Sequence, residues 1–339
     1  MFVLGIESSC DETACAIVEE GKTVLSNVIA TQTEIHTPFG GVFPELACRR
    51  HVDVIIPTVQ KALHQASVTP QEIDLIAVAT GPGLIGSLLI GVQVAKALSL
   101  AWGKPFVSVN HVEAHLYAAL MPLSEPLFPA LGVVISGGHT LLLKTQEIGR
   151  YETIGMTRDD AIGEAFDKVA TLLSLPYPGG PALETLALQG NPTRFPFRPG
   201  QVKGHPWDFS FSGLKTSVLY AVKGARASKH APLLISEEEK ADVAASFQET
   251  ALSDVVHKAL QAAEAFDCRA LFCGGGVCQN KRLKALFAEN NGRNLPIFFP
   301  PPGLVTDNGA MIAGLGYHLF CTRGGDALDA EPYSTRFKG

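Results

Sequence analysis

Two histidines, His111 and His115, stand four residues apart in the segment HVEAH, which is predicted to be helical. At this spacing both imidazoles project from one helix face, the arrangement that a single metal ion requires. A carboxylate from elsewhere in the chain would complete a His/His/carboxylate set, which suits iron(II) or zinc and leaves coordination positions open. The same spacing also occurs where two histidines are ordinary core or surface side chains. The histidine pair alone therefore does not distinguish a metal site from such side chains.

A metalloprotease is the tempting alternative for a histidine pair of this kind. Zincins carry their general base directly after the first histidine (HExxH), and inverted zincins carry it before the second (HxxEH). Here Glu113 is third in the motif and lies about 200° around the helix from His111, so it points away from the metal-binding face. Protease chemistry is therefore disfavoured.

Candidate partners for these histidines include Asp307, in the segment Thr-Asp-Asn-Gly-Ala. An aspartate just before a helix is ordinarily an N-cap, which stabilises the helix by about 1 kcal/mol. The residues alone do not decide between this role and that of a third metal ligand.

Four polar or glycine-rich turns follow apolar strands, at residues 7–11, 81–83, 136–139 and 274–276. Glycine lets backbone amides approach and surround phosphate oxygens. One such turn is explained by chain reversal alone, but several at matching places in two repeats favour a phosphate cradle. Neither a Walker A loop nor a strand–GxGxxG–helix unit is present, which excludes P-loop ATPases and dinucleotide enzymes.

The composition predicts a protein without a membrane span that works in the cytoplasm. The chain has 339 residues, 46% of them hydrophobic, and no run of 18 apolar residues. Its start shows no signal-peptide pattern, and its seven cysteines form no CxxC pair, as expected of reduced thiols. The net charge of −6 argues against a lone nucleic-acid binder, so a partner would supply much of the positive surface that RNA needs.

A repeated order of elements predicts the fold class. Three hairpin-linked strands followed by alternating helices and strands occur once in the first 110 residues and again after residue 129. This indicates an α/β protein of two duplicated βββαβα-like lobes with a ligand cleft between them. Helices are expected at about 44–66, 213–227, 237–265, 280–290 and 307–321, and the Pro/Gly-rich residues 176–212 are expected to be irregular.

Seven motifs together resemble one known family. They are the run from Val3 to Thr13 (VLGIESSCDET), HVEAH, SGGHT at 136–140, GEAFDK at 163–168, YPGGP at 177–181, DFSFSGLK at 208–215 and TDNGA at 306–310. In this order they resemble bacterial tRNA adenosine threonylcarbamoyltransferase, the TsaD family formerly labelled a glycoprotease. The resemblance runs from Phe2 to the final predicted helix.

The resemblance implies an acetate/sugar kinase–heat-shock–actin type fold. It implies an N-terminal lobe of residues 1–110, completed by the final helix 306–323, and a C-terminal lobe of 111–305 that carries most of the donor site. It also implies the reaction, in which threonylcarbamoyl-adenylate donates its acyl group to the exocyclic amine of adenosine 37 in tRNAs reading A-starting codons, with release of AMP.

The resemblance also assigns roles to individual residues. One divalent ion, iron(II) or alternatively zinc, is held by His111, His115 and Asp307. The donor is bound by Val134, Ile135, Ser136, Gly137, Gly138, Asp167, Gly180 and Asn280. The metal would polarise the carbonyl under attack, and amides of the turn after Val134 would stabilise negative charge. Asp11, Glu12 and His139 are candidate proton acceptors, among which the sequence does not choose.

Partners are implied as well. They are the tRNA, a degenerate two-lobed paralogous subunit resembling TsaB, and a P-loop ATPase resembling TsaE, because this chain lacks a Walker motif. Two other functions remain open. A sugar or acetate kinase would fit the fold but has little use for HVEAH, and a non-enzymatic scaffold would not need three potential metal ligands.

Overall fold

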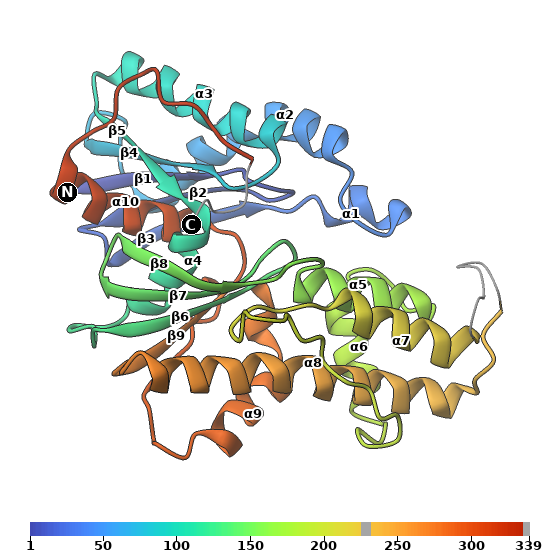
Figure 1. Ribbon diagram of the computed structural model, residues 1–339. Helices are drawn as coiled ribbons and strands as arrows, with labels where there is room; N and C mark the ends of the chain where they lie inside the picture. The colour runs from blue at the N-terminus through green and yellow to red at the C-terminus, as the bar shows by residue number, and fades with distance from the viewer. Residues whose placement is uncertain (225–231, 335–339) are drawn as a thin grey trace. The chain divides into compact units, whose positions relative to one another are not determined.

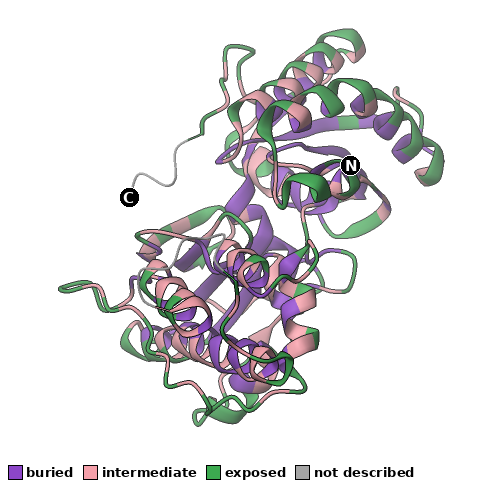
Figure 2. Ribbon diagram, turned by 90° about the vertical axis from the view of Figure 1, so that its right-hand side faces the viewer, coloured by how far each residue is buried: buried purple, intermediate pink, exposed green. Residues whose placement is uncertain are grey.

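The computed structural model describes residues 1–224 and 232–334, which form two compact α/β units (Figure 1). Unit 1 contains residues 1–126, 146–151 and the described residues from 298 onward, and unit 2 contains residues 127–145 and 152–297. In Figure 2 the buried strands lie inside each unit, and exposed helix faces lie outside. All seven cysteines are free thiols, as predicted.

Unit 1 is built on a five-stranded sheet in the order β3-β2-β1-β4-β5. Strand β1 pairs antiparallel with β2 and parallel with β4, so it lies at the centre of the sheet. Residues Val3 to Glu7 are all buried because helices cover both faces, which is why this strand is an almost unbroken apolar run. The strands are β1 (Phe2–Glu7), β2 (Thr13–Glu19), β3 (Thr23–Ala30), β4 (Ile73–Gly81) and β5 (Phe106–Asn110).

Helices cover both faces of this sheet. Figure 1 shows α2 and α3 on one face and α10 with α4 on the other. The helices are α1 (Thr33–His36), η1 (Thr37–Phe39), α2 (Pro44–Ala66), α3 (Ile85–Trp102), α4 (His111–Leu120) and α10 (Gly309–Arg323). The chain therefore returns to the N-terminal sheet with its final helix.

Two glycines allow α10 to lie directly on the sheet. A Cβ on Gly5 of β1 would clash with the carbonyl of Gly309, and a Cβ on Gly309 would clash with the main chain of Cys15 and Ala16. A glycine inside a strand often marks such a close backbone approach. This contact fixes the start of α10, and with it Asp307, against the centre of the sheet.

Unit 2 repeats the same topology. Its sheet has the order β10-β9-β6-β7-β8, and β6 pairs antiparallel with β7 and parallel with β9. The elements are β6 (Ala130–Ile135), β7 (Thr140–Glu147), β8 (Arg150–Met156), α5 (Ile162–Leu172), α6 (Gly179–Ala187), α7 (Ser212–Lys223), α8 (Glu237–Ala265), β9 (Ala270–Gly274), η2 (Gly276–Gln279), α9 (Lys281–Asn290) and β10 (Ile297–Phe298). Both sheets have the predicted meander beside a parallel pair, which confirms the duplication.

The irregular segment predicted at 176–212 is wrong in part, because α6 forms there. Its start is fixed by Asp167, whose Oδ1 accepts the amide hydrogens of Gly179 (2.9 Å) and Gly180 (3.2 Å). Proline at 181 is tolerated because amides in the first turn have no partner inside the helix. A cap supplied from another helix leaves no signal in the local sequence.

Other predicted elements differ only at their ends. The helix expected at 213–227 is α7, and residues 225–227 lie outside the described residues. The helix expected at 307–321 begins two residues later, as α10.

Helix α3 is long and apolar enough to span a membrane by length and composition alone. One such helix is weak support for a membrane protein. Leu88, Val92 and Ala95 of α3 are buried, and the helix packs on β4 and α2 within unit 1. Leu89 and Leu100 are exposed on it. We therefore treat α3 as a core helix of unit 1.

Candidate metal centre and acyl-donor residues

Helix α4 places both histidines of HVEAH on one side. Its N-cap is Asn110, at the end of β5, whose Oδ1 accepts the amide hydrogens of Val112 (2.9 Å) and Glu113 (3.1 Å). The cap starts the helix at His111, so His115 follows one turn later. The two imidazole rings lie 4.7 Å apart between centroids, and both side chains are buried. The predicted helical arrangement of the pair is therefore present.

Asp307 does not cap the helix that follows it. The N-cap of α10 is Asn308, whose Oδ1 accepts the amide hydrogen of Met311 at 2.9 Å. Asp307 instead extends Oδ1 toward the histidines, to 3.1 Å from Nε2 of His115 and 3.7 Å from Nε2 of His111. The capping role that is usual for an aspartate at a helix start therefore belongs to Asn308 and not to Asp307.

Three potential ligands consequently meet in unit 1. One ligand atom from each of His111, His115 and Asp307 lies within 4.8 Å of the other two. Nε2 of His115 is buried and makes no hydrogen bond among the described residues, although it faces Asp307. Two imidazoles and a carboxylate directed at one point form the donor set of a His/His/carboxylate metal site. The residues present therefore fit a divalent ion.

The charges around His111 favour a cation. Burial alone lowers the pKa of this imidazole, but the carboxylates of Glu7 and Asp307 outweigh burial and raise it to about 9. The same two negative charges that hold a proton on His111 would favour a metal ion beside it. The electrostatics of the site thus agree with its donor set.

Glu7 belongs to this centre and was not predicted as a site residue. It is fully buried at the end of β1, and its Oε2 lies 2.9 Å from Nδ1 of His111. A buried carboxylate at the end of an otherwise apolar strand needs a compensating partner. A glutamate at the end of an apolar strand could thus have marked Glu7 as a candidate site residue from the sequence. It would not have identified His111 as its partner.

Asp11 and Glu12 lie in the loop between β1 and β2, also in unit 1. Burial raises the pKa of both carboxyl groups, and repulsion from Asp307 adds to it. Glu12 reaches a pKa of about 7; its Oε1 accepts a hydrogen bond from the Thr31 hydroxyl at 2.9 Å. A carboxyl group with this pKa exchanges protons near neutral pH, as a proton acceptor must.

The predicted donor loop is the turn from β6 into β7 in unit 2. Val134 and Ile135 are buried at the end of β6. The turn is closed by Ser136, whose amide donates to the carbonyl of His139 at 2.8 Å and whose Oγ accepts the His139 amide hydrogen at 3.1 Å. The carbonyl of Ser136 accepts the amide hydrogen of Gly163, which joins the turn to the start of α5.

Gly137 and Gly138 are exposed at this turn. A Cβ added to either one meets no atom of the described residues within 4 Å, and neither has a positive φ. Packing and backbone conformation therefore do not require glycine at these positions. Gly180, at the start of α6, is open in the same way. Open glycines beside a turn leave room for a ligand to approach the backbone amides.

Asn280 and Asp167 use their side chains to hold helix ends. Asn280 is the N-cap of α9: its Oδ1 accepts the amide hydrogen of Leu283 at 3.0 Å, and its Nδ2 donates to Oε1 of Gln248 at 2.8 Å. Asp167 holds the start of α6, as described above. Both predicted donor residues thus have structural roles, and the sequence showed neither.

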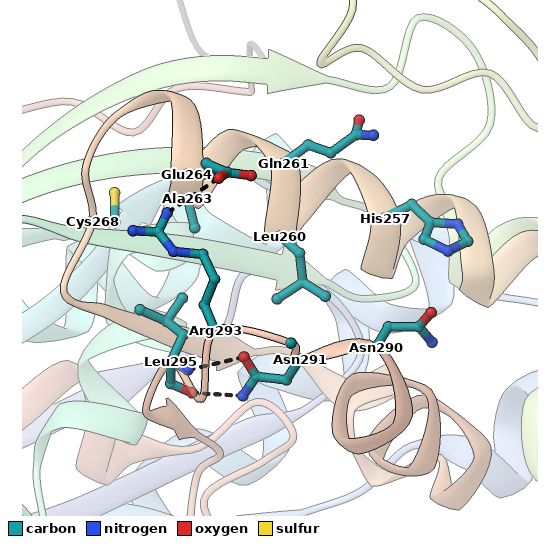
Figure 3. A pocket seen from close by; sticks show the side chains of 11 residues that line it. His257, Leu260, Gln261, Ala263, Glu264, Cys268, Asn290, Asn291, Arg293 and Leu295 are labelled. Carbon is teal, nitrogen blue, oxygen red and sulfur yellow. Dashed lines mark hydrogen bonds and ion pairs between the residues drawn. The ribbon is translucent and has the colours of Figure 1, made fainter.

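A surface pocket of about 290 Å³ lies elsewhere in unit 2, along the C-terminal half of α8 and the end of α9 (Figure 3). None of the predicted site residues lines it. Asn291 is hydrogen-bonded to the main chain of Leu295, and Arg293 lies 3.7 Å from Glu264. Because none of the predicted site residues lines it, this pocket is not part of the candidate site described above.

Comparison with solved structures defines the class of fold. Full-length HypF in its phosphate- and nucleotide-bound form matches with a TM-score of 0.62 at 13% identity, covering 96% of this chain and 56% of HypF. Component A of the (R)-2-hydroxyglutaryl-CoA dehydratase of Acidaminococcus fermentans matches with a TM-score of 0.54 at 12% identity, covering 95% and 99%. These likenesses show the fold alone. They confirm the predicted acetate/sugar kinase–heat-shock–actin type of α/β fold.

Comparison of sequences goes further. Residues 23–314 match the sequence model of TsaD, tRNA N6-adenosine threonylcarbamoyltransferase. A protein of that name from Protochlamydia amoebophila (strain UWE25) is 58% identical over 334 residues, covering 98% of this chain and 97% of the relative. Another from Chlamydia pneumoniae is 50% identical over 321 residues, covering 94% and 92%. The chain belongs to the TsaD family of tRNA-modifying transferases, as its motifs predicted.

Proposed function

We propose that this chain transfers the threonylcarbamoyl group from threonylcarbamoyl-adenylate to the exocyclic amine of adenosine 37 in tRNAs that read A-starting codons. The family supports a tRNA threonylcarbamoyltransferase. The adenylate donor and the release of AMP are chemically consistent with it, because a mixed acyl-phosphate anhydride needs no further ATP at this step.

The observation that carries the proposal is the convergence of His111, His115 and Asp307. Nε2 of both histidines and a carboxylate oxygen of Asp307 would hold one divalent ion, iron(II) or zinc. When bound there, such an ion would act as a Lewis acid toward a carbonyl oxygen. The end of α10 does not require the Asp307 carboxylate, because Asn308 is its N-cap.

The acyl donor would be bound by the backbone of unit 2. The amides of the 136–138 turn and of Gly180 lie beside open glycine positions, where a phosphate or a developing oxyanion would be stabilised by N–H groups. Val134 and Ile135 would anchor the turn from β6. Asp167 and Asn280 would orient the starts of α6 and α9 toward the same ligand.

A proton must leave the adenine amine during attack, and Asp11, Glu12 and His139 are the proposed acceptors. Burial raises the pKa of Glu12 to about 7, which suits proton exchange near neutral pH. On this ground we rank Glu12 first. Its substitution by glutamine should remove the acidic limb of the pH–rate profile, the fall in transfer rate as the pH drops below about 7.

The reaction itself provides the test of the proposed function. The chain is incubated with tRNA, chemically prepared threonylcarbamoyl-adenylate and its partner proteins, and the modified nucleoside and AMP are quantified by mass spectrometry. We expect one AMP for each modified nucleoside, after subtraction of the AMP released by hydrolysis in a control without tRNA. Modified tRNA without this additional AMP would contradict the proposed donor chemistry.

We also propose a cellular location and partner proteins for this chain. We place the protein in the cytoplasm, working with a degenerate two-lobed paralogue and a P-loop ATPase. The domain organisation, an N-terminal lobe of residues 1–110 completed by helix 306–323 and a C-terminal lobe of 111–305, also remains a proposal. It is supported by the grouping of residues from 298 onward with the N-terminal strands, although α4 groups with those strands too.

A further inference from the structure

Among the residues that the structure describes, polar side chains contact Nδ1 of His111 but not Nδ1 of His115. Nδ1 of His111 lies 2.9 Å from Oε2 of Glu7 and 3.1 Å from Oγ of Ser9. Nδ1 of His115 is buried and has no hydrogen-bond partner among the described residues. His115 is therefore held by packing, whereas His111 is held by a specific contact that constrains its ring.

Glu7 is itself fixed in place. Its side chain is fully buried, and its Oε1 accepts the amide hydrogen of Ser9 at 2.6 Å. Strand β1 supplies the residue from the centre of the sheet, so its main chain has little freedom to move. The carboxylate thus presents Oε2 to His111 in one geometry.

This geometry decides which nitrogen of His111 can bind a metal. An ionised carboxylate only accepts hydrogen bonds, so a bond to Glu7 requires a hydrogen on Nδ1. A neutral imidazole with its hydrogen on Nδ1 carries its lone pair on Nε2. Nε2 is the atom that faces Asp307, at 3.7 Å.

We infer that Glu7 is a positioning residue that fixes the tautomer and ring orientation of His111, so that Nε2 is presented to the metal ion. This inference rests on the proposed metal site and goes beyond it, because it assigns a role to a residue that never touches the ion. Residues behind metal-binding histidines commonly change metal affinity by about 10- to 100-fold when they are mutated.

The decisive variant is Glu7→Gln, which keeps the size of the side chain. Its amide oxygen can still accept from Ser9, but its NH2 group then faces His111 and donates to Nδ1. That hydrogen bond favours the opposite tautomer, with the hydrogen on Nε2, where the metal should bind. We expect the dissociation constant for zinc, measured by competition with a chromogenic chelator, to rise about 10- to 100-fold.

A matched control is Asp208→Asn in unit 2. Asp208 is also a buried carboxylate that accepts a backbone amide hydrogen, from Met156 at 2.9 Å. Its substitution should change thermal stability without changing zinc affinity. Glu7→Asp, which keeps the charge but shortens the side chain, should bind zinc with an affinity between those of wild type and Glu7→Gln.

A spectroscopic measurement on the wild-type protein requires no mutation. In the zinc-loaded protein with 15N-labelled histidine, long-range 1H–15N spectra should show His111 with a hydrogen on Nδ1 and metal on Nε2. Metal on Nδ1, or unchanged zinc affinity in Glu7→Gln, would overturn the inference. Failure of wild type to bind zinc or iron at all would instead refute the proposed metal site, so the two failures are distinguishable.

Discussion

The candidate residues of unit 1 and unit 2 are used in opposite ways. In unit 1, His111, His115 and Asp307 direct side-chain atoms at one another, and the helix ends beside them are capped by other residues, Asn110 and Asn308. In unit 2, Asp167 and Asn280 themselves hold helix ends, and the open positions are glycines with backbone amides.

This difference predicts which substitutions should affect activity and which should affect stability. A side chain that caps no helix leaves the helix end intact when it is replaced, so replacing a metal residue should affect activity more than stability. Replacing His111 or His115 also removes a buried side chain, and for His111 the contact with Glu7, so some stability is lost with them. A side chain that caps a helix should lose stability when it is replaced. An open glycine should lose ligand binding when it gains a Cβ.

The largest expected effect is in unit 1, from the double variant His111→Ala/His115→Ala. Removing two of three ligands should lower bound metal to background and reduce threonylcarbamoyl transfer by at least about 10³-fold, if the ion stabilises charge in the transition state. Metal content by mass spectrometry, transfer rate and circular dichroism are measured together. Wild-type transfer by the metal-free variant would refute the metal assignment.

A large effect is also expected in unit 2, from Gly137→Ala. The added methyl group meets no described atom within 4 Å, so thermal stability should stay within about 0.5 kcal/mol of wild type. It would occupy space beside the turn amides and should raise KM for the adenylate about tenfold or more. Unchanged KM would show that the donor does not approach this turn.

The N-caps give a sharper contrast between neighbouring residues. Asn308→Ala removes the cap of α10 and the hydrogen bonds from Asn308 Nδ2 to the carbonyls of Leu304 and Thr306, and should lower the free energy of unfolding by about 1–3 kcal/mol. Asp307→Ala should lower it by less, because Asp307 does not cap the helix. Both are measured by urea denaturation of metal-free protein. If Asp307→Ala lowers the free energy of unfolding as much as Asn308→Ala or more, Asp307 is an ordinary helix cap.

Asn280→Ala should behave as Asn308→Ala does in stability. It removes the cap of α9 and the hydrogen bond to Gln248, at a cost of about 1–2 kcal/mol. Gln248→Leu breaks only the second bond and serves as the comparison. If Asn280 also contacts the donor, its variant alone should raise KM for the adenylate.

A stability effect that depends on pH concerns Glu12, whose folded-state pKa is raised from 4.5 to about 7 chiefly by burial. Between these two values the folded state binds more protons than the unfolded state, so stability falls as pH rises, and the loss is complete above about pH 7. Glu12→Gln should therefore be more stable than wild type at pH 8, by about 1–2 kcal/mol after allowance for partial exposure, and not at pH 4. Urea denaturation of metal-free protein at both pH values checks this.

The sequence predicted those features that depend on short-range spacing. The i, i+4 histidine pair, the meander-plus-parallel topology and the bounds of α2 and α8 follow from periodicity and turn residues, and the structure has them. The fold class and the family followed from motifs spread along the whole chain. Each of these features is encoded by short runs of residues that are close together in the sequence.

Features that depend on contacts between distant segments were not predictable in the same way. The ligand role of Asp307 came only from the resemblance, because nothing local shows that Asn308 takes the cap. Helix α6 was missed because its cap comes from Asp167. The partner of Glu7 lies 104 positions along the chain, so its burial could be noticed but not explained.

Anomalous scattering from a crystal of the metal-loaded protein tests the central claim most directly. We predict one metal peak per chain within about 2.0–2.2 Å of Nε2 of His111, Nε2 of His115 and a carboxylate oxygen of Asp307. The peak should be lost in Asp307→Ala crystals that retain α10. A peak that lies elsewhere in the chain, with these three side chains uncoordinated, would contradict the account.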